Sequence, residues 1–258
     1  MSVFDSTYAD AYDLLYRDKD YASEAQFVSR LAKKHHPIAR SLLDLGSGTG
    51  RHDFEFAALG YEVSGVERSA EMLNKARSSA GNRVDFHQGD VRDVRLSREF
   101  DVVTSLFHVM SYQTTNDDVR KAMQTAWVHT KPSGIFIFDF WYGPAVLGEL
   151  PATRIKRLED ERVSLTRIAE PVLRTEVNLV EVHYELLVQK KASAEVKRFH
   201  ERHDMRYFSL PEIQWIAEEG GWDFEETGEW MTGVEPSEKS WGVYVVLRKT
   251  AKTQKIED

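Results

Sequence analysis

The segment Leu42–Gly50 (LLDLGSGTG) limits what this chain can fold into more than any other part of the sequence. A short apolar run with an acid at Asp44 is followed by three glycines at alternate positions. The run is typical of a buried strand, and the glycines allow a tight turn whose backbone approaches a ligand closely. Residues 51–59 can then start a helix whose first amides face the same ligand. The spacing is not the G-x-G-x-x-G of nicotinamide-binding proteins, and no Gly-Lys-Ser/Thr follows to form a phosphate loop.

Two later apolar runs also end in carboxylates. Residues 61–67 end at Glu67, about 20 residues beyond the turn, where dinucleotide-binding folds place an acid that accepts hydrogen bonds from ribose hydroxyls. Residues 84–90 end in Gly89-Asp90. Because the carboxyl ends of parallel strands share one edge of a sheet, Asp44, Glu67 and Asp90 are expected to line the same edge.

The order of the predicted elements indicates the fold class. After the turn, predicted strands alternate with helices, one capped by Ser69 and one by Asn116 or Asp117; these strands are 61–67, 84–90, 100–107 and 135–140. The alternation predicts an α/β fold with a Rossmann-like doubly wound sheet and helices on both faces. Two final strands, 223–230 and 241–248, complete seven, mostly parallel with an antiparallel last strand.

Between residues 151 and 207 the alternation stops. Residues 177–188 carry apolar side chains at alternate positions, and residues 197–207 can also be extended. These long segments predict an antiparallel β-sheet inserted after the fifth core strand. After the insert, Ser209 and Glu212 form a capping box for the next helix.

Composition narrows the range of partners. The 258 residues include no cysteine, which excludes disulfides, thiolate zinc sites and cysteine nucleophiles. The net charge of −8 and the pI of about 5.7 disfavour binding to nucleic acid or to an anionic membrane. The first residues show no secretory signal, and no apolar run approaches the roughly 20 residues of a membrane span. A cytoplasmic location is therefore expected.

The glycine turn and the three acids together resemble the class I S-adenosylmethionine-dependent methyltransferases. In that family the D-L-G-x-G-x-G turn contacts the methionine part of the cofactor, the second acid contacts the ribose, and a later Asp contacts the adenine. The resemblance implies S-adenosyl-L-methionine as the cofactor. The implied contacts are Asp44, Gly46, Ser47, Gly48, Gly50, Glu67, Arg68, Met72, Asp90, Val91 and Leu106. Met72 also fits the buried stripe of the helix after Ser69, so core packing is its alternative role.

Methyl transfer from a sulfonium requires alignment and exclusion of water more than a protein nucleophile. An amine acceptor attacks as the neutral base, so a group that takes or relays its proton is expected beside the end of the fourth strand. His108 and Tyr112 are the candidate catalytic residues there, and a structural hydrogen bond is the alternative role of His108. His200 and His203 would lie on opposite faces of a strand, so no metal site is expected. Ser105–His108 stands where methyltransferases of nucleic acid bases carry Asn/Asp-Pro-Pro-Phe/Tyr, which argues against that substrate.

Over nearly its whole length the chain resembles the N-methyltransferases of nucleotide-linked amino sugars. The shared segments are 11–14, 19–21, 88–93, 141–142, 181–184 and Phe208. By that resemblance Tyr12 and Tyr21 close over the cofactor, and the substrate is bordered by Trp141, Tyr142, Arg167 and His203. The sequence departs from that group at two places: those enzymes carry a histidine where Tyr112 stands and an arginine where this chain has Lys239-Ser240-Trp241.

The sequence thus predicts a methyltransferase that N-methylates the amine of a nucleotide-linked deoxyamino sugar. The alternatives are another small amine or hydroxyl acceptor, or a non-catalytic protein that binds S-adenosylmethionine. Five parts are expected: an N-terminal helical segment or lid (1–40), a cofactor-binding core (41–148), the inserted sheet (149–207), the C-terminal part of the core (208–250) and a tail (251–258). The inserted sheet is a plausible substrate lid or the contact surface of a homodimer.

Overall fold

The computed structural model describes residues 14–250, apart from 16, 82 and 194. The chain divides into two compact units. The core unit comprises Tyr21–Gly148 and Tyr207–Asp258, and the insert unit comprises Met1–Asp20 and Glu149–Arg206. None of the helices formed by the described residues is long and apolar enough to cross a bilayer.

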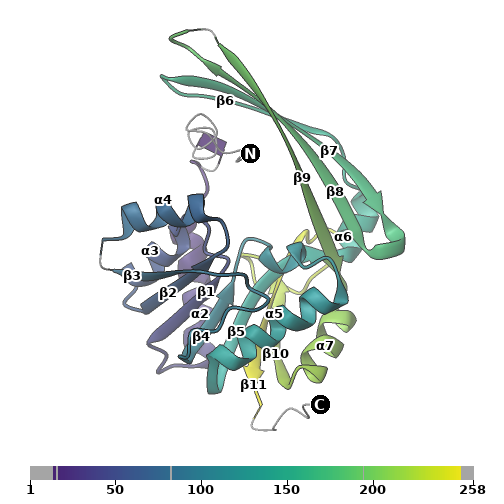
Figure 1. The fold of residues 1–258 in the computed structure, drawn as a ribbon. Coiled ribbons are helices and arrows are strands. Elements are labelled where there is room, and N and C mark those ends of the chain that lie inside the picture. Colours follow the sequence, from purple (N-terminus) through teal and green to yellow (C-terminus); the bar gives the residue numbers. More distant parts are fainter. Residues whose placement is uncertain (1–13, 16, 82, 194, 251–258) are drawn as a thin grey trace. The chain divides into compact units, whose positions relative to one another are not determined.

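The described residues of the core unit form a sheet of seven strands. They are β1 (Ser41–Leu45), β2 (Glu62–Glu67), β3 (Val84–Gln88), β4 (Phe100–Ser105), β5 (Thr130–Tyr142), β10 (Trp222–Glu229) and β11 (Gly242–Lys249). Their order across the sheet is β3-β2-β1-β4-β5-β11-β10. The first five strands run parallel, whereas β11 is antiparallel to β5 and β10. The predicted Rossmann-like sheet with an antiparallel last strand is confirmed (Figure 1).

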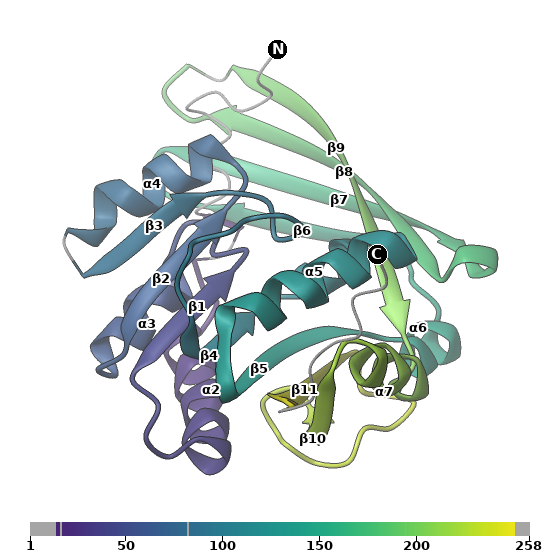
Figure 2. The same ribbon diagram turned by 60° about the horizontal axis from the view of Figure 1, so that its bottom comes forward.

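Helices cover both faces of this sheet (Figure 2). On one face lie α2 (Tyr21–His35), α3 (Arg51–Ala58) and α4 (Ala70–Ala80), and on the other lie α5 (Asn116–His129) and α7 (Leu210–Glu219). In β5, Ile135 and Ile137 join the first core cluster, whereas Phe136 and Phe138 join the second. Successive side chains of a strand point to opposite faces, so an unbroken apolar run is buried on both. A short helix, α6 (Gly143–Glu149), follows β5.

Several strand boundaries differ from the predicted ones. β3 and β4 end at Gln88 and Ser105, so Asp90 and His108 lie in loops beyond the strands. β5 was predicted over 135–140 but already starts at Thr130. Residues 131–134 belong to the strand, and the pairing of β5 with β4 shifts register across them.

Local capping signals were mostly correct. Ser69 caps α4, and Ser209 with Glu212 forms the capping box of α7, as predicted. The cap of α5 is Thr115, one residue before the predicted Asn116 or Asp117. Thr115 has the extended backbone that an N-cap requires, and its side chain accepts a hydrogen bond from the amide of Asp118.

The insert unit contains the predicted antiparallel sheet. Its strands are β6 (Arg154–Glu159), β7 (Val163–Arg174), β8 (Leu179–Lys190) and β9 (Val196–Phe208), paired in sequence order, with the short helix η2 (Thr175–Val177) between β7 and β8. Leu14 and Leu15 pack on one face with apolar residues of β7 and β8. The last two residues of β9, Tyr207 and Phe208, belong to the core unit, where they pair in parallel with the end of β5.

Candidate active site

The glycine turn after β1 has the backbone that its sequence predicts. Gly46, Gly48 and Gly50 have φ values of 92°, 58° and 77°, a region that residues with a side chain seldom adopt. A Cβ built on Gly46 would lie 2.6 Å from Cγ2 of Val109, so glycine is also required for space. α3 begins directly after Gly50, so its free amides and positive dipole end lie at the turn.

Glu67 fastens this turn to the end of β2. Its Oε2 accepts the backbone N–H of Gly48 at 2.9 Å, and its Oε1 accepts the backbone N–H of Ser69 at 2.7 Å. A carboxylate has about four acceptor positions, so each oxygen can still accept a hydrogen bond from a ligand hydroxyl. The side chain is therefore both held in place and able to bind.

Asp44 lies beneath the turn. It is 2% exposed, and its carboxyl accepts a hydrogen bond from Oγ1 of Thr104 at 2.7 Å. Burial raises the pKa of this carboxyl to about 6. Asp53 in the first turn of α3 is also fully buried, and burial together with the charge of Asp44 raises its pKa.

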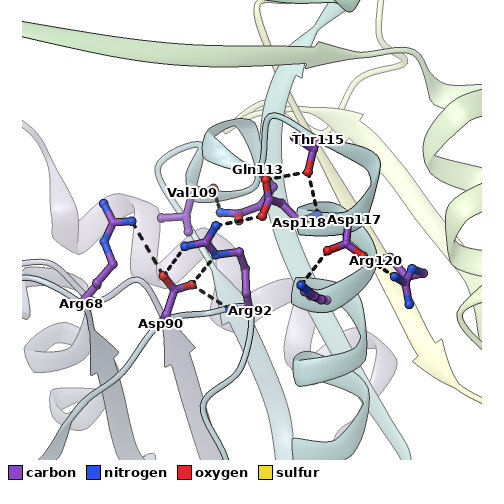
Figure 3. Close-up of polar contacts among 10 residues, drawn as sticks. Arg68, Asp90, Arg92, Val109, Gln113, Thr115, Asp117, Asp118 and Arg120 are labelled. Carbon is purple, nitrogen blue, oxygen red and sulfur yellow. Dashed lines mark hydrogen bonds and ion pairs between the residues drawn. The ribbon is translucent and has the colours of Figure 1, made fainter.

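The loop after β3 holds Asp90 through an arginine that the sequence reasoning missed. Arg92 donates from Nε to Oδ1 at 2.9 Å and from Nη2 to Oδ2 at 2.7 Å (Figure 3). The same guanidinium donates from Nη1 to Oδ1 of Asp118, in the first turn of α5, at 2.8 Å. These hydrogen bonds from Arg92 lower the pKa of Asp90. Arg68, largely exposed, is a more distant ion-pair partner at 3.8 Å.

The remaining predicted cofactor residues occupy different surroundings. Leu106 is 2% exposed and belongs to the first core cluster, whereas Met72 and Val91 are half-buried. Ser47 is buried within the glycine turn. Tyr21 begins α2 and packs its ring edge against His52 at 4.9 Å. Tyr12 lies outside the described residues.

His108 lies in the loop after β4, next to Asp139 of β5. Its Nδ1 is 2.7 Å from Oδ2 of Asp139, and its backbone N–H lies 3.2 Å from both carboxylate oxygens. Asp139 is 1% exposed, so its carboxylate is removed from water and depends on these partners. Sequence reasoning treated Asp139 only as a strand residue, although a lone acid in the apolar run Ile135–Phe140 signals a buried partner.

Aromatic side chains lie next to His108. Trp141 lies edge-on to it with ring centroids 6.3 Å apart, and Trp241 lies edge-on to Trp141 at 5.8 Å. Phe107 lies against the histidine at 5.8 Å. Tyr112 ends the 3₁₀ helix η1 (Val109–Tyr112) and is 46% exposed. Tyr142, the other predicted substrate residue here, is half-buried and packs against the second core cluster.

Two predicted substrate residues lie in the insert unit, where the structure brings them together. The guanidinium of Arg167 lies over the ring of Tyr184 at 5.1 Å, and His203 lies edge-on to the same ring at 4.9 Å. Nε2 of His203 is 3.2 Å from a carboxylate oxygen of Glu201. Arg167, Tyr184 and His203 thus form one polar and aromatic cluster on the sheet of the insert unit.

Comparisons with known proteins identify the family. A family model described as a methyltransferase domain matches residues 42–134. A dTDP-3-amino-3,4,6-trideoxy-alpha-D-glucopyranose N,N-dimethyltransferase from Streptomyces venezuelae is 32% identical over 216 residues, which cover 82% of this chain and 88% of that protein. A dTDP-4-amino-2,3,4,6-tetradeoxy-D-glucose N,N-dimethyltransferase from Saccharopolyspora spinosa is 34% identical over 185 residues, 71% of this chain and 74% of that one.

A solved structure extends the similarity to the fold. The crystal structure of Streptomyces venezuelae DesVI matches with a TM-score of 0.81 and 27% identity, covering 96% of this chain and 100% of the other. The glycine turn, the acids at the ends of β1 and β2 and the acid after β3 all lie at the carboxyl ends of the parallel strands, the edge at which doubly wound sheets generally bind ligands. The chain therefore belongs to the family of S-adenosylmethionine-dependent methyltransferases, and S-adenosylmethionine is its cofactor.

Proposed function

We propose that this enzyme N-methylates the amine of a nucleotide-linked deoxyamino sugar. One observation carries the proposal. The methyltransferase model matches only 42–134, whereas the similarity to the Streptomyces venezuelae amino sugar enzyme covers 82% of the chain. That similarity therefore extends well beyond the segment that the methyltransferase model matches. Acceptor specificity in a methyltransferase resides outside the cofactor-binding segments, because the cofactor is common to all members.

The residues present fit the cofactor. A Cβ built on Gly48 would meet no atom within 4 Å, so the backbone of the turn is open there to the methionine part of the cofactor. We propose that Glu67 accepts hydrogen bonds from the ribose hydroxyls and that Asp90 contacts the adenine. Arg68, Met72, Val91, Leu106, Tyr12 and Tyr21 complete the proposed contacts. When bound, the cofactor supplies a methyl group on a positively charged sulfur.

The protein's part in the reaction is alignment and removal of a proton. The acceptor nitrogen attacks with its lone pair, so an ammonium must first lose a proton. His108 is the proposed proton acceptor, and Tyr112 is the second candidate. Trp141 and Tyr142 are proposed acceptor contacts in the core unit, and Arg167 and His203 in the insert unit.

Mass spectrometry of product formation tests this function. Purified protein is incubated with S-adenosylmethionine and a panel of nucleotide-linked amino sugars, with the matching hydroxy sugars and common small amines as controls. A gain of one or two methyl masses on one amino sugar, absent from its hydroxy counterpart, supports the proposal. A gain of methyl mass only on another amine or on a hydroxyl acceptor would contradict the amino sugar proposal and identify a different substrate class. Tight cofactor binding without any product favours the non-catalytic alternative.

The insert unit offers a surface for assembly. We propose a cytoplasmic enzyme that assembles as a homodimer through the insert unit. One face of its sheet exposes the aliphatic side chains of Ile155, Val172 and Val196, which are 53%, 46% and 57% exposed. Light scattering of the purified protein, repeated with Val172→Lys, tests this assembly: the proposal requires a dimer that the lysine weakens.

A further inference from the structure

Asp139 contacts the same residue at two points. Its carboxylate lies 2.7 Å from the imidazole Nδ1 of His108 and 3.2 Å from the backbone nitrogen of His108. Asp139 comes from β5 and His108 from the loop after β4, so the contact joins two neighbouring strands of the sheet. The carboxylate is 1% exposed, whereas the His108 side chain is 25% exposed. The acid is thus enclosed, and the histidine that it holds still reaches the surface.

The backbone at this point is held in an unfavourable conformation. Phe107 and His108 both have a φ of 62°, in the left-handed region that residues with a side chain seldom adopt. Such conformations persist where the surrounding structure holds them, and they concentrate at functional sites. Here the carboxylate of Asp139 accepts from the His108 amide, so the acid stabilises the loop conformation as well as the ring.

The contact leaves one ring nitrogen available. Among the described residues, Nε2 of His108 makes no hydrogen bond. Nδ1 is buried, and its 2.7 Å contact with the carboxylate does not have the geometry of a hydrogen bond in this structure. Catalytic hydrogen bonds are often poorly aligned before substrate binds and tighten afterwards. A carboxylate beside Nδ1 favours the neutral tautomer that carries its proton there, and Nε2 then has the free lone pair.

The aromatic side chains next to His108 suit the binding of an amine. The rings of Phe107 and Trp141 lie next to the imidazole of His108, and Trp241 packs edge-on against Trp141. Aromatic faces attract ammonium groups and tolerate added methyl groups. A substrate amine and its methylated product can therefore both be held beside Nε2.

We propose that Asp139 is a positioning residue for this methyl transfer: it holds His108 in the Nδ1–H tautomer, so that Nε2 takes the proton of the acceptor amine. The proposal rests on the proposed function. The amine proton passes to Nε2, and the nitrogen lone pair then forms the new N–CH₃ bond. The S–CH₃ bond breaks as its electron pair stays on sulfur, giving a neutral thioether. The ionised Asp139 balances the imidazolium until its proton leaves to water.

The test compares two acid-to-amide variants at opposite ends of neighbouring strands. Asp139→Asn changes the proposed positioning residue. Asp101→Asn is the control at the start of β4, where the acid accepts hydrogen bonds from Ser41 and Lys131. We expect Asp139→Asn to lower kcat about 10–100-fold, with the Kd for S-adenosylmethionine within about twofold of wild type. Asp101→Asn should leave kcat unchanged. A folded Asp139→Asn enzyme with wild-type kcat overturns the proposal.

A second measurement does not depend on activity. Ring-nitrogen NMR of the neutral form of His108 in the wild-type protein should show the proton on Nδ1, and Asp139→Asn should lose that preference. A wild-type proton on Nε2 overturns the proposal even if the variant does not fold. Failure of the proposed function has a different signature, because the wild-type enzyme would then methylate no amino sugar while the tautomer measurement still decides the role of Asp139.

Discussion

The carboxylate of Glu67 accepts the backbone N–H of Gly48 at 2.9 Å, so the acid that ends β2 holds the glycine turn that follows β1. Its second oxygen accepts the N–H of Ser69, the residue that caps α4. One side chain therefore fixes two backbone segments at the edge of the sheet. It is preorganised for a ligand before any ligand arrives.

Replacing Glu67 should weaken cofactor binding. We expect Glu67→Ala to cost about 1–3 kcal/mol of binding free energy for S-adenosylmethionine, because the ribose loses its acceptor and the turn loses its support. Titration calorimetry measures the change. Ser69→Ala is the control: it removes the side-chain cap at a cost of about 1 kcal/mol in stability and keeps the backbone N–H that Glu67 accepts. An unchanged Kd in Glu67→Ala would contradict the ribose assignment.

We expect cofactor binding to depend on the planar guanidinium of Arg92 as well as on its charge. Arg92→Lys keeps the charge and loses the two parallel hydrogen bonds to Asp90, so we expect weaker cofactor binding in this variant. Asp118→Asn weakens the link from Arg92 to α5 and the hydrogen bond from Oγ1 of Thr115 to the same carboxylate, but it leaves both hydrogen bonds from Arg92 to Asp90, so it should affect the Kd less. Equal effects of the two variants would show that Arg92 acts by bracing α5 and not by orienting Asp90.

Asp44 should make stability depend on pH. Burial raises its pKa from 3.8 to about 6, so between these values the folded protein holds a proton that the unfolded chain has released. This stabilising contribution is complete below pH 3.8 and is lost as the pH rises to about 6. Asp44→Asn cannot titrate, so its stability relative to wild type should rise by about 2 kcal/mol from pH 4 to pH 7. Urea unfolding without cofactor at several pH values measures this difference, and parallel curves would refute the prediction.

The cap of α5 offers a test of local energetics. Thr115→Ala should destabilise the protein by about 1 kcal/mol, because the amide of Asp118 loses its side-chain acceptor. Asn116→Ala should change the unfolding free energy little, since Asn116 lies inside the helix. Thermal unfolding of both variants distinguishes them. If Asn116→Ala lost more stability than Thr115→Ala, Asn116 would be the helix cap, as predicted from the sequence.

Much of the fold and part of the candidate site could be predicted because their signals are local. Apolar runs ending in acids marked β1 and β2, and the capping residues Ser69 and Ser209 marked the starts of α4 and α7. Right-handed crossovers then leave few ways to assemble alternating strands and helices. The cap at Thr115 was missed because adjacent polar residues compete and backbone dihedrals, absent from the sequence, decide between them.

By itself the sequence determined the succession of strands and helices along the chain, the glycine turn and the acids near the strand ends, because each depends on residues close together in the chain. Only the tertiary structure decided that Arg92 donates hydrogen bonds to both Asp90 and Asp118, and that the carboxylate of Asp139 contacts the imidazole of His108. Those pairs depend on the register of β5 against β4 and on loop conformations beyond the strand ends. A buried carboxylate must find a partner, but only the packing of distant segments determines which one.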